Sequence, residues 1–168
     1  QTPPNQVLIA LALFLTFFVM QPTMTAFYEQ ALSPYLDGQM PAEQAIEIGS
    51  GILRAFLIEN TRQNDLMMFQ QLAGDGPYAT QDDVPMSVLL PAFITSELKT
   101  AFQIGFLIYL PFLVIDMVVA SILMALGMMM LSPMLVSLPI KLLLFVLVDG
   151  WALTVGSLAA TYGVGVGG

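Results

Sequence analysis

The stretch AFQIGFLIYLPFLVIDMVVASILMALGMMML, residues 101 to 131, decides the fold class of this chain. Asp116 is its only charged side chain. An apolar run of about 20 residues already matches the hydrocarbon core of a bilayer, and an acidic residue inside such a run marks a pairing or functional position. Water is therefore excluded from this segment in the folded protein.

The composition of the chain points to the same environment. Hydrophobic residues make up 57% of the 168 positions, more than the roughly half that is typical of soluble domains. We expect an all-α protein of a membrane or membrane complex, with Pro-kinked helices in helical hairpins. A chain of this length has little room for a separate soluble domain, so it must bury much of its apolar surface against lipid or other subunits. Oligomerisation is the consequence.

The absence of two residue types limits the reactions and the metal sites that the chain could support. The sequence has no cysteine and no histidine, which removes disulfides, thiol nucleophiles, and the commonest proton shuttle and transition-metal ligand. We expect no enzyme, no cofactor and no metal site.

Charge divides the chain. Nine of the twelve acids lie between Glu29 and Asp83, and Arg54 and Arg62 are the only bases there, which gives this segment a net charge of −7. Because lysine and arginine mark cytoplasmic loops, a segment poor in them is compatible with the outer side of a membrane. We expect residues 25–85 to form an acidic, extracytoplasmic helical segment. Nucleic acid is not an expected partner of so acidic a chain.

Residues 1–24 form the first hydrophobic segment. The apolar run in it spans Val7 to Met20, and Pro22 is expected to end the run. The run lacks the basic flank and the small-residue cleavage site of a signal peptide, and the chain has no initiator methionine, so an internal fragment or a processed product is expected.

Two helices are predicted in the acidic segment. The first follows Pro41, because apolar residues recur at spacings of three and four and proline suits a first turn. The second covers Asp65 to Leu72, and the residues Gly74 to Pro77 then form a turn.

Residues 86–162 are predicted to form a hydrophobic helical hairpin, followed by a glycine-rich tail at 163–168. Pro91 and Pro111 predict kinks or breaks in the first arm. The arms meet between Met128 and Pro133. If the turn is centred on Met129, Asp116 lies thirteen residues before it and Lys141 twelve after it, so an antiparallel hairpin places the two charges at similar heights. They are expected to pair with each other or with the next copy of the chain.

Several blocks of sequence carry a specific resemblance. The chain contains TPPNQV at 2–7, LALFLT at 11–16, ELKTAFQIGF at 97–106, PFLVID at 111–116, GMMM at 127–130 and LVDGW at 147–151. In content and order these blocks resemble the FliP family of flagellar type III export-gate proteins and its virulence-system counterparts. The family also has an amino-terminal hydrophobic region before the first block. That region is missing here, so we expect this stretch of sequence not to insert into a membrane independently.

The resemblance implies a core subunit of the gate that exports unfolded proteins during flagellum biogenesis. The implied partners are further copies of the chain, five in all, with FliQ-like and FliR-like subunits and FlhB-like and FlhA-like export components. The implied location is the flagellar basal body in the bacterial inner membrane, with a segment facing the periplasm. The blocks favour a flagellar over a virulence system.

Met128, Met129 and Met130 carry the sharpest functional hypothesis, since the resemblance implies that they form a loop that seals the pore as a gasket. Methionine is unbranched and flexible, so a ring of it can close against water yet deform around a passing polypeptide. The alternative is that the three side chains fill a core, because twelve methionines in the chain make a cluster unsurprising.

Five charged residues form a second group: Arg62, Glu97, Lys99, Asp116 and Lys141. We favour structural ion pairs, because charges excluded from water persist when they are paired. The alternative function is an ion-coupled transporter or channel subunit that uses Asp116 and Lys141. An intramembrane aspartyl protease built on Asp116 and Asp149 is disfavoured, because the Gly-x-Gly-Asp arrangement of such enzymes does not occur in the sequence.

Overall fold

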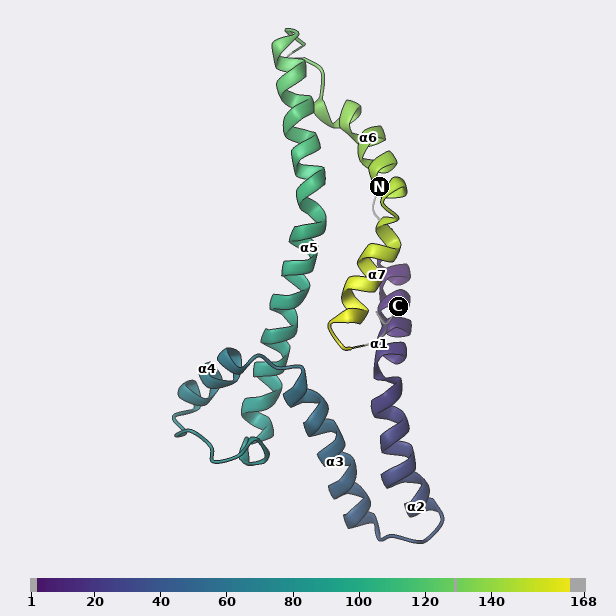
Figure 1. Ribbon diagram of the computed structural model, residues 1–168, viewed down its shortest axis with the longest axis vertical. Helices are drawn as coiled ribbons and strands as arrows, with labels where there is room; N and C mark the ends of the chain where they lie inside the picture. Colours follow the sequence, from purple (N-terminus) through teal and green to yellow (C-terminus); the bar gives the residue numbers. More distant parts are fainter. Residues whose placement is uncertain (1–2, 129, 164–168) are drawn as a thin grey trace. The chain divides into compact units, whose positions relative to one another are not determined.

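The computed structural model describes residues 3–128 and 130–163, and these residues form helices joined by turns (Figure 1). No strand occurs in these two ranges. The prediction of an all-α fold is confirmed. Met129, Thr2 of the first family block and most of the glycine-rich tail lie outside the described residues.

The chain divides into two compact units, residues 1–99 and 100–168. The first unit holds α1 (Asn5–Phe27), a π-helix (Tyr28–Leu32), α2 (Ser33–Leu36), α3 (Ala42–Glu59), α4 (Gln63–Ala73) and a 3₁₀ turn (Gln81–Asp83). The second holds α6 (Pro133–Leu147) and α7 (Gly150–Ala160). The long helix α5 (Met86–Ala125) contributes to both units.

The first unit begins with a helical hairpin. The chain runs through α1, the π-helix and α2, turns, and returns along α3 (Figure 1). Helix α3 begins directly after Pro41, and α4 contains the predicted Asp65–Leu72 stretch, so both helix predictions are confirmed. The ring of Phe27 packs against Gly49, where an added Cβ would lie 2.5 Å from the ring. Glycine at this position therefore lets the two arms approach closely.

Proline does not interrupt these helices as the sequence suggested. Helix α1 continues through Pro22, so the prediction that Pro22 ends the first apolar run is wrong. A proline removes only its own N–H bond, and where water does not compete the remaining hydrogen bonds keep the helix intact. Pro91 and Pro111 lie inside α5, so neither breaks that helix.

The first unit contains a small hydrophobic core. Leu57, Val84, Val88 and Leu89 are buried together under partly buried neighbours such as Phe69. The Arg54 guanidinium donates to the Val84 carbonyl, which fixes α3 against the start of α5. Full burial of one such side chain stabilises the fold by about 1.5–3 kcal/mol.

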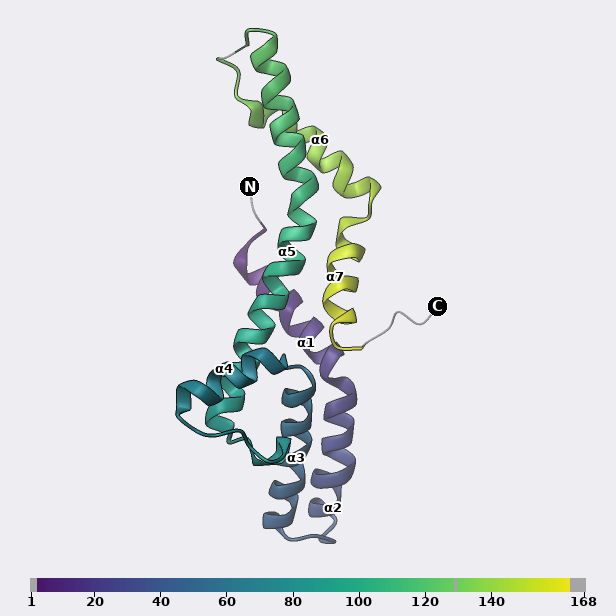
Figure 2. The same cartoon turned by 60° about the vertical axis from the view of Figure 1, so that its left-hand side comes forward.

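In the second unit, the C-terminal part of α5 forms one arm, and the second arm begins with α6 at Pro133 (Figure 2). Its second arm is divided: α6 and α7 meet at a bend of 58° across Val148 and Asp149. The sequence pattern does not predict this break, because no proline marks it.

Apolar surface dominates both units. Residues 5–36 and 86–125 form helical stretches of 32 and 40 residues that are long and apolar enough to cross a membrane, and the bent pair of α6 and α7 adds a third candidate. At 1.5 Å per residue these stretches span about 48 and 60 Å, against about 30 Å of hydrocarbon. Each therefore extends beyond the apolar core of a bilayer.

Candidate functional site

The methionine loop begins where α5 ends. The Met128 N–H donates to the Leu123 carbonyl and the Gly127 N–H donates to the Met124 carbonyl. These two bonds form a Schellman cap, which requires a left-handed residue, and Gly127 supplies it with φ of +75°. The backbone at the start of the loop is thus fixed by the helix end.

The loop displays its side chains. Met128 is half exposed and Met130 is fully exposed. Pro133 then opens α6 as the first helical residue, where its missing N–H costs nothing. Two helix ends therefore flank a short segment, and neither of its two described methionines, Met128 and Met130, is buried.

Behind the loop, α6 presents two polar side chains to α5. The Lys141 Nζ lies 2.6 Å from the Asp116 Oδ2. The Ser137 hydroxyl is a second donor to the same carboxylate and also lies 3.4 Å from the Met134 carbonyl. A hydroxyl has one proton, and a carboxylate is the stronger acceptor. Ser137 and Lys141 are four residues apart on one helix face, so together they hold Asp116 between them.

This contact joins charges on two apolar helices. Ser137 is completely buried, and the side chains of Lys141 and Asp116 are 24% and 36% exposed. Because each charge is expensive to leave alone in an apolar setting, the pair fixes the register of α6 on α5.

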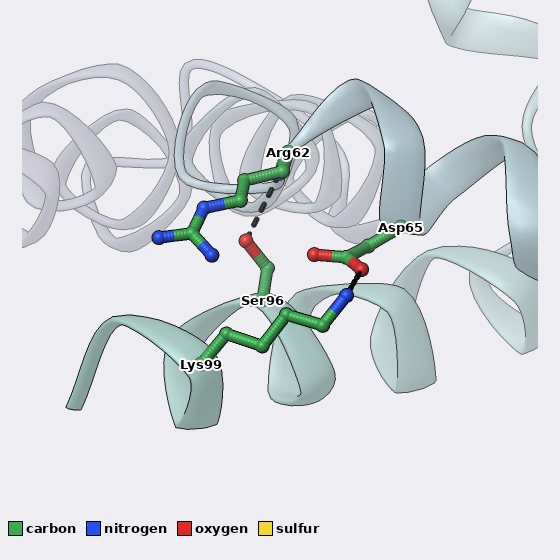
Figure 3. Close-up of polar contacts among 4 residues, drawn as sticks. All are labelled: Arg62, Asp65, Ser96 and Lys99. Atoms are coloured by element: carbon green, nitrogen blue, oxygen red, sulfur yellow. Dashed lines mark hydrogen bonds and ion pairs between the residues drawn. The ribbon is translucent and has the colours of Figure 1, made fainter. Parts of the chain in front are cut away.

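A second polar cluster joins the start of α4 to α5 (Figure 3). Lys99 donates from α5 to the Oδ1 atom of Asp65. The Asp65 side chain is 2% exposed, whereas that of Lys99 is 50% exposed. The lysine thus covers a buried carboxylate from the solvent side, and the position of Asp65 in the first turn of α4 also suits its negative charge.

The same cluster supplies the cap of α4. The backbone N–H of Arg62, the N-cap residue, donates to the Ser96 hydroxyl at 3.0 Å. Ser96 is buried on α5. A serine from another helix therefore accepts from the N-cap N–H, as the N3 side chain does in a capping box. Both contacts link residues 34 positions apart, 62 with 96 and 65 with 99, so α4 and α5 meet in a single register.

One atom of this cluster has no hydrogen-bond partner among the described residues, the Oδ2 atom of Asp65. A buried carboxylate oxygen without a donor costs free energy. The Lys99 contact is consequently the main compensation for burying this charge.

The structure brings together some of the predicted site residues. It places Asp116 beside Lys141, and it places Lys99 beside Asp65. Arg62 joins that cluster through its backbone N–H, and Glu97 lies on α5 next to Ser96. Sequence analysis missed Asp65, Ser96 and Ser137. The spacing of Ser137 four residues before Lys141 was a usable signal for one of them.

Known proteins resemble this chain over nearly its whole length. The FliP family matches residues 1–158. The chain is 80% identical over 162 residues to the flagellar biosynthetic protein FliP of Cereibacter sphaeroides, covering 96% of this chain and 54% of that protein. It is 57% identical to the protein of that name from Pectobacterium carotovorum over 95% of this chain and 62% of the relative, and 52% identical to that of Bacillus subtilis over 95% and 72%.

The chain spans about half the length of the first of these relatives. The match nevertheless covers nearly all of the present sequence, including the loop, the Asp116 contact and the Asp65 cluster. The resemblance found from the sequence blocks is thereby confirmed, and the chain belongs to the FliP family.

Proposed function

We propose that this chain is a core part of a flagellar protein-export gate, in which its methionine loop seals a pore for unfolded substrate proteins. The observation that supports this most directly is the loop itself. A Schellman cap ends α5 on one side of the loop and Pro133 begins α6 on the other, while Met128 and Met130 remain exposed. Flexible apolar side chains between two fixed helix ends suit a seal that must close against water and yield to a polypeptide.

The proposed assembly is a ring of five copies with FliQ-like and FliR-like subunits, in contact with FlhB-like and FlhA-like components. The supporting observation is uncovered apolar surface. Among residues 3–128 and 130–163 the buried apolar side chains are Ala31, Leu57, Val84, Val88, Leu89, Ala92, Val119 and Leu123. Large side chains such as Phe14, Phe102 and Leu147 are more than 60% exposed. Lipid and neighbouring subunits together would cover such surfaces.

The proposed location is the bacterial inner membrane at the flagellar basal body, with the acidic segment facing the periplasm. The helical lengths support this, because stretches of about 48 and 60 Å cross a bilayer and continue beyond it. The acidic segment is compatible with the outer side.

The gasket is tested by replacing Met128, Met129 and Met130 together with alanine in the full-length protein in cells. Leakage of ions or small solutes across the inner membrane is measured beside the export of a reporter substrate. We expect leakage with export retained. A matched control replaces Met67 and Met68, two exposed methionines on α4, and should leave the membrane tight. A tight membrane and normal export in the loop variant would return the trio to simple packing.

For the charged residues we propose structural pairing, not ion transport. The supporting observation is that Asp116 already has two donors, Lys141 and Ser137. A double substitution, Asp116→Asn with Lys141→Gln, removes both charges and keeps hydrogen-bonding groups of similar size. Assembly and export should survive it better than either single substitution. A transporter or channel that needs the carboxylate would lose function in the double variant as fully as in Asp116→Asn alone.

A further inference from the structure

The break between α6 and α7 is the least expected feature of the second unit. Only Val148 and Asp149 separate the two helices, and the helix axes differ by 58°. The residues on both sides are apolar, and an interrupted helix in an apolar setting loses backbone hydrogen bonds that must be compensated. The residues at the break show how this is done.

Asp149 makes the turn. Its backbone has φ of +49° and ψ of +63°, and it is the one residue other than glycine with a positive φ in residues 3–128 and 130–163. The left-handed conformation is unfavourable for any residue with a Cβ atom, although aspartate tolerates it better than most. Its carboxylate also accepts from the Ala152 N–H at 3.4 Å and so caps α7.

Two aromatic rings hold the bent arrangement. Phe145 comes from α6 and Trp151 from α7, and their rings meet edge to face at 5.6 Å and 87°. Phe145 also covers the buried Gly150, where an added Cβ would lie 2.2 Å from the ring. Because the rings lie on opposite sides of the break, their contact is lost if α6 and α7 straighten.

The surroundings leave room for movement. A partly open pocket of about 310 Å³ lies between α5 and the two sides of the break, and its lining includes Ile108, Phe112, Phe145 and Leu153. The described side chains leave this pocket unfilled, so the helix faces that line it have space to move. Helix α6 is tied to α5 by the Lys141–Asp116 pair, whereas residues 150–160 carry no charge.

We propose that Asp149 and Gly150 form a hinge on which α7 swings between the bent arrangement and a straighter one, while α6 remains fixed to α5. In the bent state, the aromatic contact and the carboxylate cap offset the strain at Asp149. In the straighter state, Asp149 takes the helical conformation and the backbone bonds run through the break. Opposing terms of this kind make a two-state element. An effect of the swing on the width of the pore rests on the proposed function. The hinge itself does not depend on that function.

Distances between paired spin labels test the hinge. The 168 residues contain no cysteine, so labels at Leu142→Cys on α6 and Ala160→Cys on α7 are the only ones in this part of the full-length protein. In a continuous helix these positions are about 27 Å apart, at 1.5 Å per residue over 18 residues. The bend makes the separation shorter. A control pair at Met134→Cys and Val146→Cys lies within α6 alone.

In the assembled membrane complex, labelled chains are diluted with unlabelled ones so that only pairs within one copy are measured. Two distances are then expected for the pair that spans the break, and one for the control pair. Asp149→Gly removes the carboxylate cap, but it also removes the strain of the bent state and disfavours the helical conformation of the straighter one, so it should enrich the shorter distance. Asp149→Ala removes the cap, adds helix propensity and should enrich the distance near that of a continuous helix. The glycine variant preserves the test if the alanine variant does not assemble. A single distance, identical in the parent and in each variant that assembles, would overturn the hinge whether or not the protein exports.

Discussion

Removing the amine of Lys99 should destabilise the first unit more than its half-exposed position suggests. The variant is Lys99→Met, which keeps most of the side-chain volume but leaves the Asp65 carboxylate without its donor. Asp65 is almost completely buried; Lys99 donates to its Oδ1 atom, and its Oδ2 atom has no hydrogen-bond partner among the described residues. The loss of stability in Lys99→Met therefore comes from the buried Asp65 carboxylate, which no longer has a cation beside it.

Breaking a buried ion pair by removing one partner costs about 3–5 kcal/mol. Because the Lys99 side chain is 50% exposed, water reaches part of the site, and we expect the lower limit of about 3 kcal/mol. For a chain of this size each 1 kcal/mol corresponds to a change of about 2–4 °C in the melting temperature. The Lys99→Met variant should consequently melt about 6–12 °C below the parent.

The assay is thermal unfolding of the full-length protein in detergent, followed by far-ultraviolet circular dichroism. Lys99→Arg, which keeps a cation at the same place, is the matched control and should melt close to the parent. Asp65→Asn combined with Lys99→Met removes both charges, so the double variant should be more stable than the sum of the single changes predicts, by about 1 kcal/mol or more. Equal melting of parent and Lys99→Met, with strictly additive effects in the double variant, would refute the reasoning.

Three further predictions concern other positions. Ser137→Ala should cost about 1 kcal/mol of stability, and Lys141→Met more, because the first removes one hydrogen bond to Asp116 and the second leaves a charge unpaired; the melting temperatures of the two variants decide the order. Gly127→Ala should cost about 1 kcal/mol or more, because the left-handed cap of α5 is strained for a residue with a Cβ atom; Gly105→Ala, at an open position inside α5, is its control and should be neutral or slightly stabilising. The hydrogen bond that the Tyr78 hydroxyl donates to the Asp75 carboxylate raises the pKa of Tyr78 to about 12; Asp75→Asn should move this transition in an ultraviolet pH titration back toward 10, and any stability from the contact is present below pH 10 and lost as the pH rises toward 12. An unchanged titration in Asp75→Asn would show that the bond does not form in solution.

Several parts of the fold followed from local patterns. The helices after Pro41 and around Asp65–Leu72, and the two arms joined near Met128, were all predicted because apolar periodicity and turn residues act over a few positions. The positions of proline predicted the ends of helices less well. Pro22, Pro91 and Pro111 lie within helices, because one missing hydrogen bond does not end a helix whose other bonds face no competition from water.

The sequence by itself determined the all-α class, the membrane-length apolar helices, the family blocks and the turn with methionines between two apolar arms. These depend on composition and on contacts between near neighbours in the chain. Only the tertiary structure shows that Asp65 pairs with Lys99 and that Ser96 accepts from the backbone at the start of α4. It also shows that Ser137 contacts Asp116 and that the second arm bends at Asp149. Each of these features depends on a side chain 20 or more residues away or on the backbone conformation of one residue. Long-range contacts and single backbone angles produce no periodic pattern in the sequence.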